Sequence, residues 1–409
     1  MQVVSARFSI KDAHKIEVAK ANGAYLELEK YLNLDREFIV EAIDKSGLRG
    51  KGGGGGSCGV KWKNMIAYAK KTEAKKCYLV INGDESEPGT CKDKYILNLD
   101  PHLLIEGIII SAYALGANIA YVYIRGEYER EYNSLKNAIN EAKAELNGLE
   151  IIVYKGAGAY ICGEKTALLE SIEGKRGHPR LKPHDKSEPD FLFGSPCVVN
   201  NVETIASVPF IVKNGWEAYR SVGTEKSPGT LLFQISGCVN TPCVKEAAFG
   251  TKMIDFINEF GGGVWKNRDL KAVIPGGSSA AVLTKDEVLK ATLDYESLKD
   301  FKSSLGTGGM IVFDDKTDMP KTLLNLLEFY TEESCGQCTP CREGCGWAYR
   351  VVKKIVDGKG SLKDLQTLKD ICFMLDGKTI CVFAPAVKDV IIGFITKFED
   401  EFIRYLKKD

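Results

Sequence analysis

Residues 77–89 read CYLVINGDESEPG, a short apolar run followed directly by a polar loop that Pro88 and Gly89 close. An apolar run of this length, bounded by turn residues, is typical of a buried strand. Three acids and one amide then stand at the end of that strand. A solvated acidic turn has the same composition, so this loop alone does not define a site.

Similar apolar segments recur on the C-terminal side, and helical segments separate them. We expect strands at 118–125 and 150–155, with a charged amphipathic helix at 129–146 between them. The longest apolar stretch, 103–124, is interrupted near Gly116, which predicts a buried helix and then a strand rather than a membrane span. This alternation, with glycines at the strand ends, predicts an α/β sheet with ligands at the strand termini.

Composition and length exclude several classes of protein. The chain has 409 residues, which at roughly 150 residues per domain suggests two to four domains. Lys and Arg number 55, as do Asp and Glu, so a basic nucleic-acid surface is not expected. The first residues lack the apolar core of a signal peptide. We expect a cytoplasmic protein whose 13 cysteines serve metals or redox chemistry rather than disulfides.

The pattern changes twice along the chain. We expect an α/β domain over 1–224, a small α+β module over 225–315 and a helical bundle over 316–409. The N-terminal residues 1–45 are expected to be helical. The remaining expected segments are strands at 230–236 and 272–274 and helices at 252–260, 323–331, 348–356, 362–374 and 387–406.

The most specific motif is SCGQCTPCR, which starts at residue 334. Its C-x2-C-x2-C spacing brings the thiolates of Cys335, Cys338 and Cys341 onto one tight loop, and Cys381 can supply a fourth. Four thiolates without a nearby histidine suit a [4Fe–4S] cluster or an all-cysteine zinc site. The three-plus-one distribution favours the cluster, because structural zinc more often uses two separated C-x2-C pairs. Reduced cysteines without a metal are the remaining alternative.

Two glycine-rich segments offer backbone N–H groups to an anion. In the first, 47–59, the run Gly50–Gly56 precedes a lysine at position 61, and we expect no regular structure there. In the second, 156–169, a glycine turn opens a helix whose free N–H groups are suited to a phosphate. A flexible linker and a plain helix start are equally compatible with these two patterns.

A pair of asparagines forms a further candidate. Residues 198–204 read VVNNVET, in which Asn200 and Asn201 offer amide donors and acceptors. An ordinary turn would have the same composition, so the pair gains meaning only from its neighbours.

Together these motifs stand in the order and spacing of one family. The chain resembles the FMN-carrying, NADH-oxidising flavoprotein subunit of respiratory complex I, which also occurs in multimeric hydrogenases and formate dehydrogenases. The matching segments, spanning 47–387, are GLRGKGG…GVKW, NGDESEPGT, GAGAYICGEKTALLESIEGKRGHPRLKP, VVNNVET and SCGQCTPCR…CVFAPAV. The resemblance implies an α/β fold class: an FMN-binding α/β domain, a small β-grasp (ubiquitin-like) domain and a C-terminal helical bundle with a [4Fe–4S] cluster. A flavin accepts a hydride and releases electrons singly, which suits transfer from a nicotinamide to a cluster.

The resemblance also implies roles for individual residues. Glu87, near the bound nicotinamide nucleotide, and Glu164 are the expected catalytic residues. The expected cofactor-binding residues are Gly50, Gly52, Gly53, Lys61, Asn82, Asp84, Glu85, Tyr160, Gly163, Glu164, Lys165, Val199, Asn200 and Asn201. The expected ligands of the cluster are Cys335, Cys338, Cys341 and Cys381.

The chain departs from the family's pattern at the nucleotide site. Three stacking aromatics are replaced by Gly56, Asn64 and Asp185, and each lost contact costs on the order of 1 kcal/mol. Lys165 replaces the second glutamate of the family's G-E-E, which predicts attraction of a 2′-phosphate and acceptance of NADPH. A solvated Lys165, with other side chains filling the adenine site, is the alternative. Cys58 replaces the family's threonine, and a thiol beside a flavin is also a candidate redox group.

The expected function is that of one subunit of a multimeric oxidoreductase. It would pass electrons between NAD(P)H and a partner's clusters through FMN and one [4Fe–4S] cluster, with electron bifurcation left open. The alternative is a relay or scaffold that has lost dinucleotide binding or uses another carrier. Expected partners are a thioredoxin-like [2Fe–2S] subunit, a larger iron–sulfur subunit of a hydrogenase or dehydrogenase, and ferredoxin, but no nucleic acid.

Overall fold

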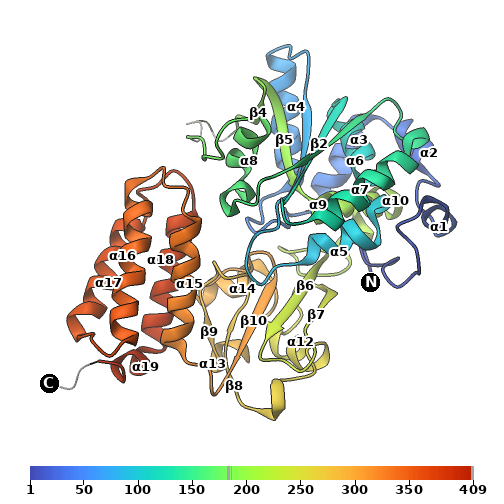
Figure 1. Ribbon diagram of the computed structural model, residues 1–409. Helices are drawn as coiled ribbons and strands as arrows, with labels where there is room; N and C mark the ends of the chain where they lie inside the picture. Colours follow the sequence, from blue (N-terminus) through green and yellow to red (C-terminus); the bar gives the residue numbers. More distant parts are fainter. Residues whose placement is uncertain (182–184, 186, 407–409) are drawn as a thin grey trace.

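The computed structural model describes residues 1–181, 185 and 187–406 and shows three parts (Figure 1). An α/β part and a second sheet lie one above the other in this view, and a helical bundle stands beside them. The end of the third matching segment, Lys182 and Pro183, lies outside the described residues.

A five-stranded sheet forms the centre of the first part, with the order β3-β2-β1-β5-β4. The strands are β1 (Tyr78–Gly83), β2 (Ile119–Ile124), β3 (Glu150–Lys155), β4 (Asp190–Leu192) and β5 (Ser195–Asn201). β1 pairs in parallel with β2, β2 pairs in parallel with β3, and β1 pairs in parallel with β5, while β4 is antiparallel to β5. Because β2 and β3 lie on one side of β1 and β5 lies on the other, ligands are expected at the carboxyl ends of β1 and β5.

Helices cover this sheet and form most of its core. They are α1 (Ile16–Ala21), α2 (Leu28–Leu32), α3 (Arg36–Ser46), α4 (Cys58–Lys71), α5 (Lys92–Leu99), α6 (Pro101–Leu115), α7 (Glu129–Glu141), α8 (Lys165–Ile172), α9 (Val202–Ala206), α10 (Val208–Asn214) and α11 (Trp216–Arg220), with 3-10 turns η1 (Lys143–Glu145) and η2 (Tyr160–Gly163). α6 is buried along almost its whole length, which explains the long apolar stretch. Its N-cap is Asp100, and it ends at Gly116 with a φ of 70°, as predicted.

The described residues contain no single helix that is both long and apolar enough to cross a membrane. α5 and α6 together meet the length and composition requirements, but their axes are bent by 97°.

The second sheet has the order β7-β6-β10-β8-β9. Its elements are β6 (Thr230–Gly237), β7 (Cys243–Ala248), α12 (Met253–Glu259), η3 (Trp265–Asn267), β8 (Leu270–Ile274), β9 (Leu283–Thr284), α13 (Lys285–Val288), α14 (Tyr295–Asp300) and β10 (Gly309–Asp314). The central pair β6 and β10 is parallel and the other pairs are antiparallel, with the core including Phe233, Phe256 and Val312. The predicted β-grasp arrangement is therefore present, although β7, β9 and β10 were not predicted.

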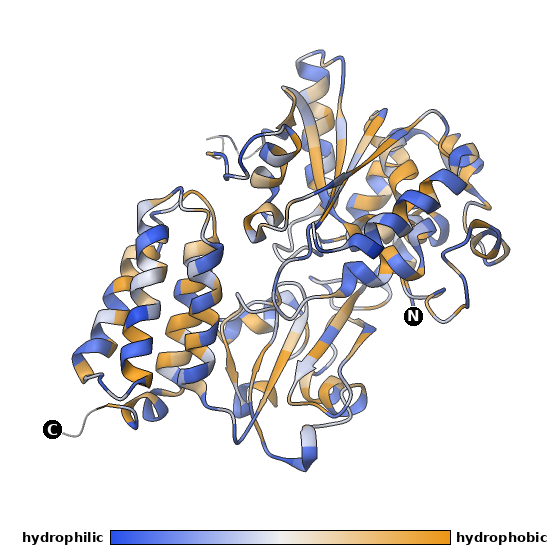
Figure 2. Ribbon diagram, viewed as in Figure 1, coloured by the Kyte–Doolittle hydropathy of each residue, from blue (hydrophilic) through white to orange (hydrophobic). Residues whose placement is uncertain are grey.

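The third part is a bundle of α15 (Met319–Glu333), α16 (Thr339–Val356), α17 (Leu362–Leu375) and α18 (Phe383–Lys397), followed by α19 (Glu399–Ile403). Figure 2 shows apolar and polar residues alternating around these helices, as expected for helices with one buried face. The three parts are packed together, because one apolar cluster contains Leu168 of α8, Ile274 of β8 and Leu327 of α15.

Several boundaries predicted from the sequence are wrong. Residues 1–15, expected to be helical, form turns, and the helix expected over 129–146 ends at Glu141. Helix α4 begins at Cys58, inside the segment expected to be irregular, because the Ser57 side chain caps it by accepting from the Val60 N–H. Helix α16 begins at residue 339 rather than 348, since proline is well tolerated in a first helical turn. The helix expected over 387–406 ends at Lys397, and a separate short helix follows.

A stability prediction follows from the contact between α6 and α9. Replacing glycine by alanine inside a helix normally stabilises it by about 0.8–1 kcal/mol. In Gly107→Ala, however, the new Cβ would lie 2.3 Å from the Ile205 carbonyl oxygen. We expect a destabilisation of roughly 1–3 kcal/mol, measured as a lower thermal unfolding midpoint.

The matched control is Gly346→Ala in α16, whose Cβ would meet its nearest neighbour at 3.5 Å, an ordinary contact. This variant should be as stable as the wild type or more stable. Equal effects of the two substitutions would contradict the packing argument.

Candidate functional site

The motifs meet at the carboxyl ends of the parallel strands. NGDESEPGT follows β1, GAGAYICGE follows β3, and the two asparagines end β5. The glycine loop precedes α4, which packs beside β5. The structure therefore brings together segments that are separated by more than 100 residues in the chain.

The glycine loop is an ordered part of the site. The Gly50 N–H donates to the Gly56 carbonyl oxygen at 2.8 Å, and the Tyr295 hydroxyl donates to the Gly50 carbonyl oxygen at 3.2 Å. Gly55 has a φ of +61°, and a Cβ there would lie 2.5 Å from the Tyr295 ring. A Cβ at Gly54 or Gly56 would meet nothing within 4 Å, so that side of the loop faces open space. These contacts argue against a flexible linker.

Gly52 and Gly53, the other two predicted glycines of this loop, are also constrained by the structure. A Cβ at Gly52 would lie 3.2 Å from Cβ of Asn201, and Gly53 has a φ of +107° that favours glycine. The loop backbone thus approaches the end of β5 closely, as a phosphate-binding loop requires.

A buried ion network, which the sequence did not predict, lies beneath the loop. The Lys51 ammonium is 3.2 Å from a Glu203 carboxylate oxygen and 2.8 Å from the Ser207 hydroxyl. The Lys92 ammonium is 3.2 Å from the other Glu203 oxygen and 2.7 Å from the Asp93 carboxylate. Burial acts to raise the pKa of Glu203, but the two lysines outweigh it and hold that pKa below its ordinary value.

Asn201 and Asn200 have different surroundings. Asn201 belongs to the network, because its Oδ1 accepts from Lys92 at 3.0 Å and its Nδ2 donates to Asp93 at 2.6 Å. Asn200 is only 2% exposed, and its Nδ2 has no hydrogen-bond partner among residues 1–181, 185 and 187–406. Since buried donors are almost always paired, this amide is a donor available to a bound group.

Cys58 and Lys61 lie at the start of α4 beside this amide. The Cys58 thiol donates to Asn200 Oδ1 at 3.5 Å, and burial raises the pKa of Cys58 to about 12. A group with that pKa remains a thiol at neutral pH, which argues against a redox role. The Lys61 ammonium donates to the Val199 carbonyl oxygen at 3.0 Å, and burial lowers the pKa of Lys61.

The polar loop after β1 is held by protein donors. Asn82 donates to the Gly163 carbonyl oxygen at 2.9 Å and so connects β1 to η2. The buried Glu85 carboxylate accepts from the Asp93 N–H at 2.8 Å and the Tyr128 hydroxyl at 3.1 Å. Burial raises the pKa of Asp84 to about 7 and also raises that of Glu85.

The predicted catalytic glutamates have separate environments. Glu87 accepts from the Tyr160 hydroxyl at 2.5 Å. Glu164 caps α8, because one of its oxygens accepts from the N–H groups of Thr166 at 2.9 Å and Ala167 at 3.0 Å. Its position at the N-cap gives Glu164 a structural role whether or not it also contacts a cofactor.

Lys165, the first residue of α8, makes an ion pair with Asp190 of β4 at 2.8 Å. The side chain of Lys165 is 46% exposed. An ion pair this exposed contributes about 0–1 kcal/mol, so it is easily exchanged for another anion.

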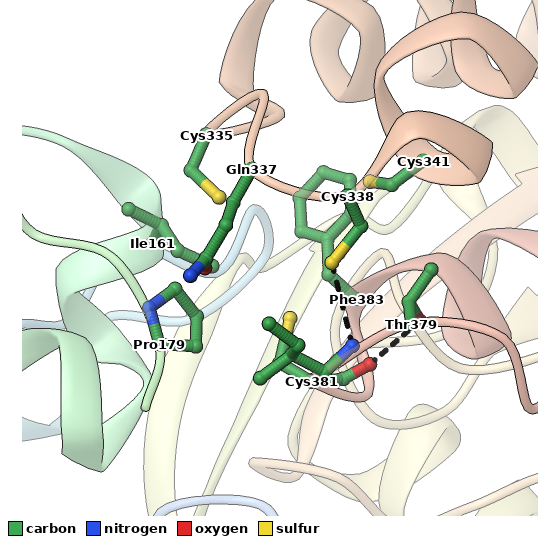
Figure 3. A pocket seen from close by; sticks show the side chains of 10 residues that line it. Ile161, Pro179, Cys335, Gln337, Cys338, Cys341, Thr379, Cys381 and Phe383 are labelled. Carbon is green, nitrogen blue, oxygen red and sulfur yellow. Dashed lines mark hydrogen bonds between the residues drawn. The ribbon is translucent and has the colours of Figure 1, made fainter. Parts of the chain in front are cut away.

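The four predicted cluster ligands line one cavity (Figure 3). Cys341 lies in the first turn of α16, Cys338 is the N-cap of that helix, and Cys381 lies just before α18. Cys338 Sγ accepts from the Ile380 N–H at 3.4 Å, and Cys341 Sγ is 3.2 Å from the Ser334 hydroxyl. The remaining lining residues are Ile161, Pro179, Gln337, Thr379, Ile380 and Phe383.

The donors around this cavity fit an iron–sulfur cluster. Four thiols face an apolar lining, and neither a carboxylate nor an imidazole is among the described lining residues. Among all the residues that the structure describes, no three His, Cys, Asp or Glu side chains lie close enough together to bind a single metal ion. A hydrogen bond from Cys345 lowers the pKa of Cys341, although burial acts to raise it.

Comparison with known proteins first gives the class of each part. The model of the Nuo51 FMN-binding domain matches residues 43–210, that of the SLBB domain matches 231–312, and that of the NADH-ubiquinone oxidoreductase-F iron-sulfur binding region matches 321–405. The matches confirm a mixed α/β fold with an FMN domain and a helical [4Fe–4S] region. FMN and the cluster are therefore its cofactors.

The relatives identify the family. The F subunit of the NADH-quinone oxidoreductase of Rickettsia felis is 44% identical over 97% of this chain and 95% of its own length. The corresponding protein of Rickettsia bellii strain OSU 85-389 is 45% identical over 96% of this chain and 95% of its own. The chain belongs to this family of F subunits, which are flavin- and iron–sulfur-containing oxidoreductase subunits of a multisubunit complex.

A solved structure agrees with this assignment. A chain of the NAD+-reducing [NiFe]-hydrogenase in its H2-reduced state superposes with a TM-score of 0.83 at 33% identity, over 92% of the present chain. The present chain spans 64% of the length of that chain.

The unpartnered amide predicts a contribution to FMN binding. Asn200→Ala removes the Nδ2 donor, which has no partner in the described part of the chain, so we expect FMN to bind about tenfold more weakly. The measurement is the dissociation constant from the fluorescence of released FMN. Asn240→Ala, at an exposed position in the loop between β6 and β7, is the control and should leave FMN binding unchanged. Equal FMN affinity of Asn200→Ala and the wild type would contradict the role of Asn200.

Proposed function

We propose that the chain oxidises a nicotinamide nucleotide with bound FMN and passes the electrons through one [4Fe–4S] cluster to clusters of partner subunits. The observation that carries this proposal is the cavity of four cysteines, which is also lined by Ile161 of the flavin-side turn η2. The two cofactor sites therefore adjoin through one short segment. The NADH-quinone oxidoreductase relatives favour NADH as the nucleotide.

Different residues of the chain bind FMN, the nucleotide and the cluster in this proposal. FMN supplies the chemistry that accepts a hydride and releases single electrons. The N–H groups of the glycine loop, with Lys61 and the Asn200 amide, hold the phosphate side. Asn82, Asp84 and Gly163 line the flavin, and Glu87 faces the nucleotide. Cys335, Cys338, Cys341 and Cys381 hold the cluster.

We also propose three units with the boundaries 1–224, 225–315 and 316–409, and partners that accept electrons. These are a thioredoxin-like [2Fe–2S] subunit and a larger iron–sulfur subunit, with ferredoxin as the partner if the complex bifurcates electrons. We propose a cytoplasmic location. None of the 13 cysteines forms a disulfide bond in the described structure, which suits a reducing compartment.

A second candidate function is a relay that has lost dinucleotide binding. The absence of aromatic side chains at Gly56, Asn64 and Asp185 favours it. Anaerobic titration of the purified FMN-containing complex separates the two functions. Bleaching of the flavin absorption by NADH or NADPH supports the proposed function, and bleaching by neither nucleotide supports the relay.

The charge at position 165 predicts the choice of nucleotide. The weak ion pair of Lys165 with Asp190 leaves the lysine able to attract a 2′-phosphate. We expect kcat/KM for NADH to exceed that for NADPH by less than about tenfold in the wild type, a gap of about 1.4 kcal/mol. Lys165→Glu should increase this preference for NADH by about tenfold.

The control is Lys76→Glu, an exposed position at the amino end of β1, opposite the site. It makes the same change in net charge and should leave the preference unaltered. The same shift in both variants would mean that net charge, rather than Lys165, sets the preference.

The open space beside the glycine loop predicts a gain of affinity. A Cβ at Gly56 would meet no neighbour within 4 Å, so Gly56→Phe has room to begin a side chain at the position where the family stacks adenine. A stacking contact contributes about 1 kcal/mol, so we expect the KM for NADH to fall about fivefold.

Gly54→Phe places the same ring at an equally open position of the loop and serves as the control. It should not lower the KM. If Gly56→Phe binds NADH no better than the wild type, the adenine does not lie beside this loop.

A further inference from the structure

Glu87 is a carboxylate that two parts of the chain hold in place. It follows β1, and its oxygens accept from the Tyr160 hydroxyl at 2.5 Å, the Ser279 N–H at 2.7 Å and the Ser278 hydroxyl at 3.2 Å. The two serines belong to the loop between β8 and β9 of the second sheet. Gly277 permits this close approach, because a Cβ there would lie 2.4 Å from Cγ of Glu87.

Tyr330 of α15 connects the third part of the chain to this carboxylate. Its hydroxyl lies 2.7 Å from Ser278 Oγ, and the residue is only 1% exposed. Ser278 has a single hydroxyl hydrogen, which Glu87 accepts, so Tyr330 is the donor and Ser278 the acceptor in this pair. The hydrogen bonds therefore run from Tyr330 to Ser278 and from Ser278 to Glu87.

The Tyr330 ring is fixed by the aromatic residues around the cluster cavity. It packs edge-on against Phe329, with ring centroids 5.3 Å apart, and against Phe383 at 5.6 Å. Phe383 lines the cavity of the four cysteines. The donor that directs Ser278 is thus held rigidly by the iron–sulfur bundle.

We propose that Tyr330 is a positioning residue for nucleotide oxidation, which acts through Ser278 to hold Glu87 toward the bound nicotinamide nucleotide. The inference rests on the proposed function. Without the Tyr330 donor, the Ser278 hydroxyl is free to rotate away from Glu87, and the carboxylate loses one of three fixed donors. A misoriented Glu87 weakens the binding of the nucleotide that it faces. FMN is held by other residues, so its binding should not change.

The experiment measures steady-state nucleotide oxidation and FMN affinity of the FMN- and iron-containing complex. Tyr330→Phe removes only the hydroxyl, and we expect the KM for NADH to rise about fivefold, with kcat and the FMN dissociation constant within about twofold of the wild type. Ser278→Ala should have the same effect, and Ser278→Thr, which keeps the hydroxyl, should restore the wild-type KM. Tyr113→Phe, which removes a hydroxyl bonded to the Leu34 carbonyl oxygen at 2.8 Å, is the matched control and should change nothing.

The double variant Tyr330→Phe/Ser278→Ala decides whether Tyr330 acts through Ser278. If it does, the KM of the double variant equals that of Ser278→Ala alone. Multiplied effects, an unchanged KM in Tyr330→Phe, or an equal loss of FMN affinity would each overturn the inference. If Tyr330→Phe does not fold, the two Ser278 variants decide the question. Equal KM values for NADH in Ser278→Ala and Ser278→Thr would then overturn the inference. A wild-type complex that oxidises neither nucleotide overturns the proposed function as well, whereas an active wild type with unaffected variants overturns this inference alone.

Discussion

The pairing of Glu203 with two buried lysines is the interaction on which the geometry of the flavin site depends. Lys51 fixes the start of the glycine loop, and its N–H also donates to the Thr204 hydroxyl at 2.9 Å. Lys92 fixes the start of α5, and Glu203 also accepts from the Leu232 N–H of the second sheet at 2.9 Å. Isolated buried charges cost several kcal/mol each, so none of these groups is tolerated without the others. The network therefore connects the loop, the end of β5 and the second sheet.

The sequence predicted the architecture where apolar periodicity was strong. The strands near 78–83, 119–124 and 150–155 and the buried helix that ends at Gly116 are present, because their apolar runs and terminal glycines are local signals. β5 was not predicted, since its last residues are polar and its apolar face is defined only by pairing with β1, more than 100 residues away. The early start of α16 was also missed, because the whole cysteine motif, including residues 339–341, was assigned to a loop.

The sequence indicated which segments would lie together, but it did not predict how their side chains are paired. The motifs showed which loops would meet, and the four cysteines do line one cavity. Asn200 and Asn201 are adjacent in the chain, yet Nδ2 of Asn200 has no partner among the described residues, whereas Asn201 belongs to the ion network. Only the folded structure reveals this difference. Lys51, Lys92 and Glu203 were missed for the same reason, because charged side chains are ordinarily solvated.

The turn η2 connects the proposed flavin site to the cysteine cavity. Within four consecutive residues, the Tyr160 hydroxyl bonds Glu87, the Ile161 side chain lines the cysteine cavity, and the Gly163 carbonyl accepts from Asn82 at the end of β1. Glu164 then caps α8, so the turn is fixed at its C-terminal end by a helix. A segment this short cannot lengthen without breaking one of these contacts. The backbone therefore sets the separation between the end of β1 and the cysteine cavity, whereas the contacts of Glu87 with the second sheet and the bundle are made through side chains and can vary independently of it.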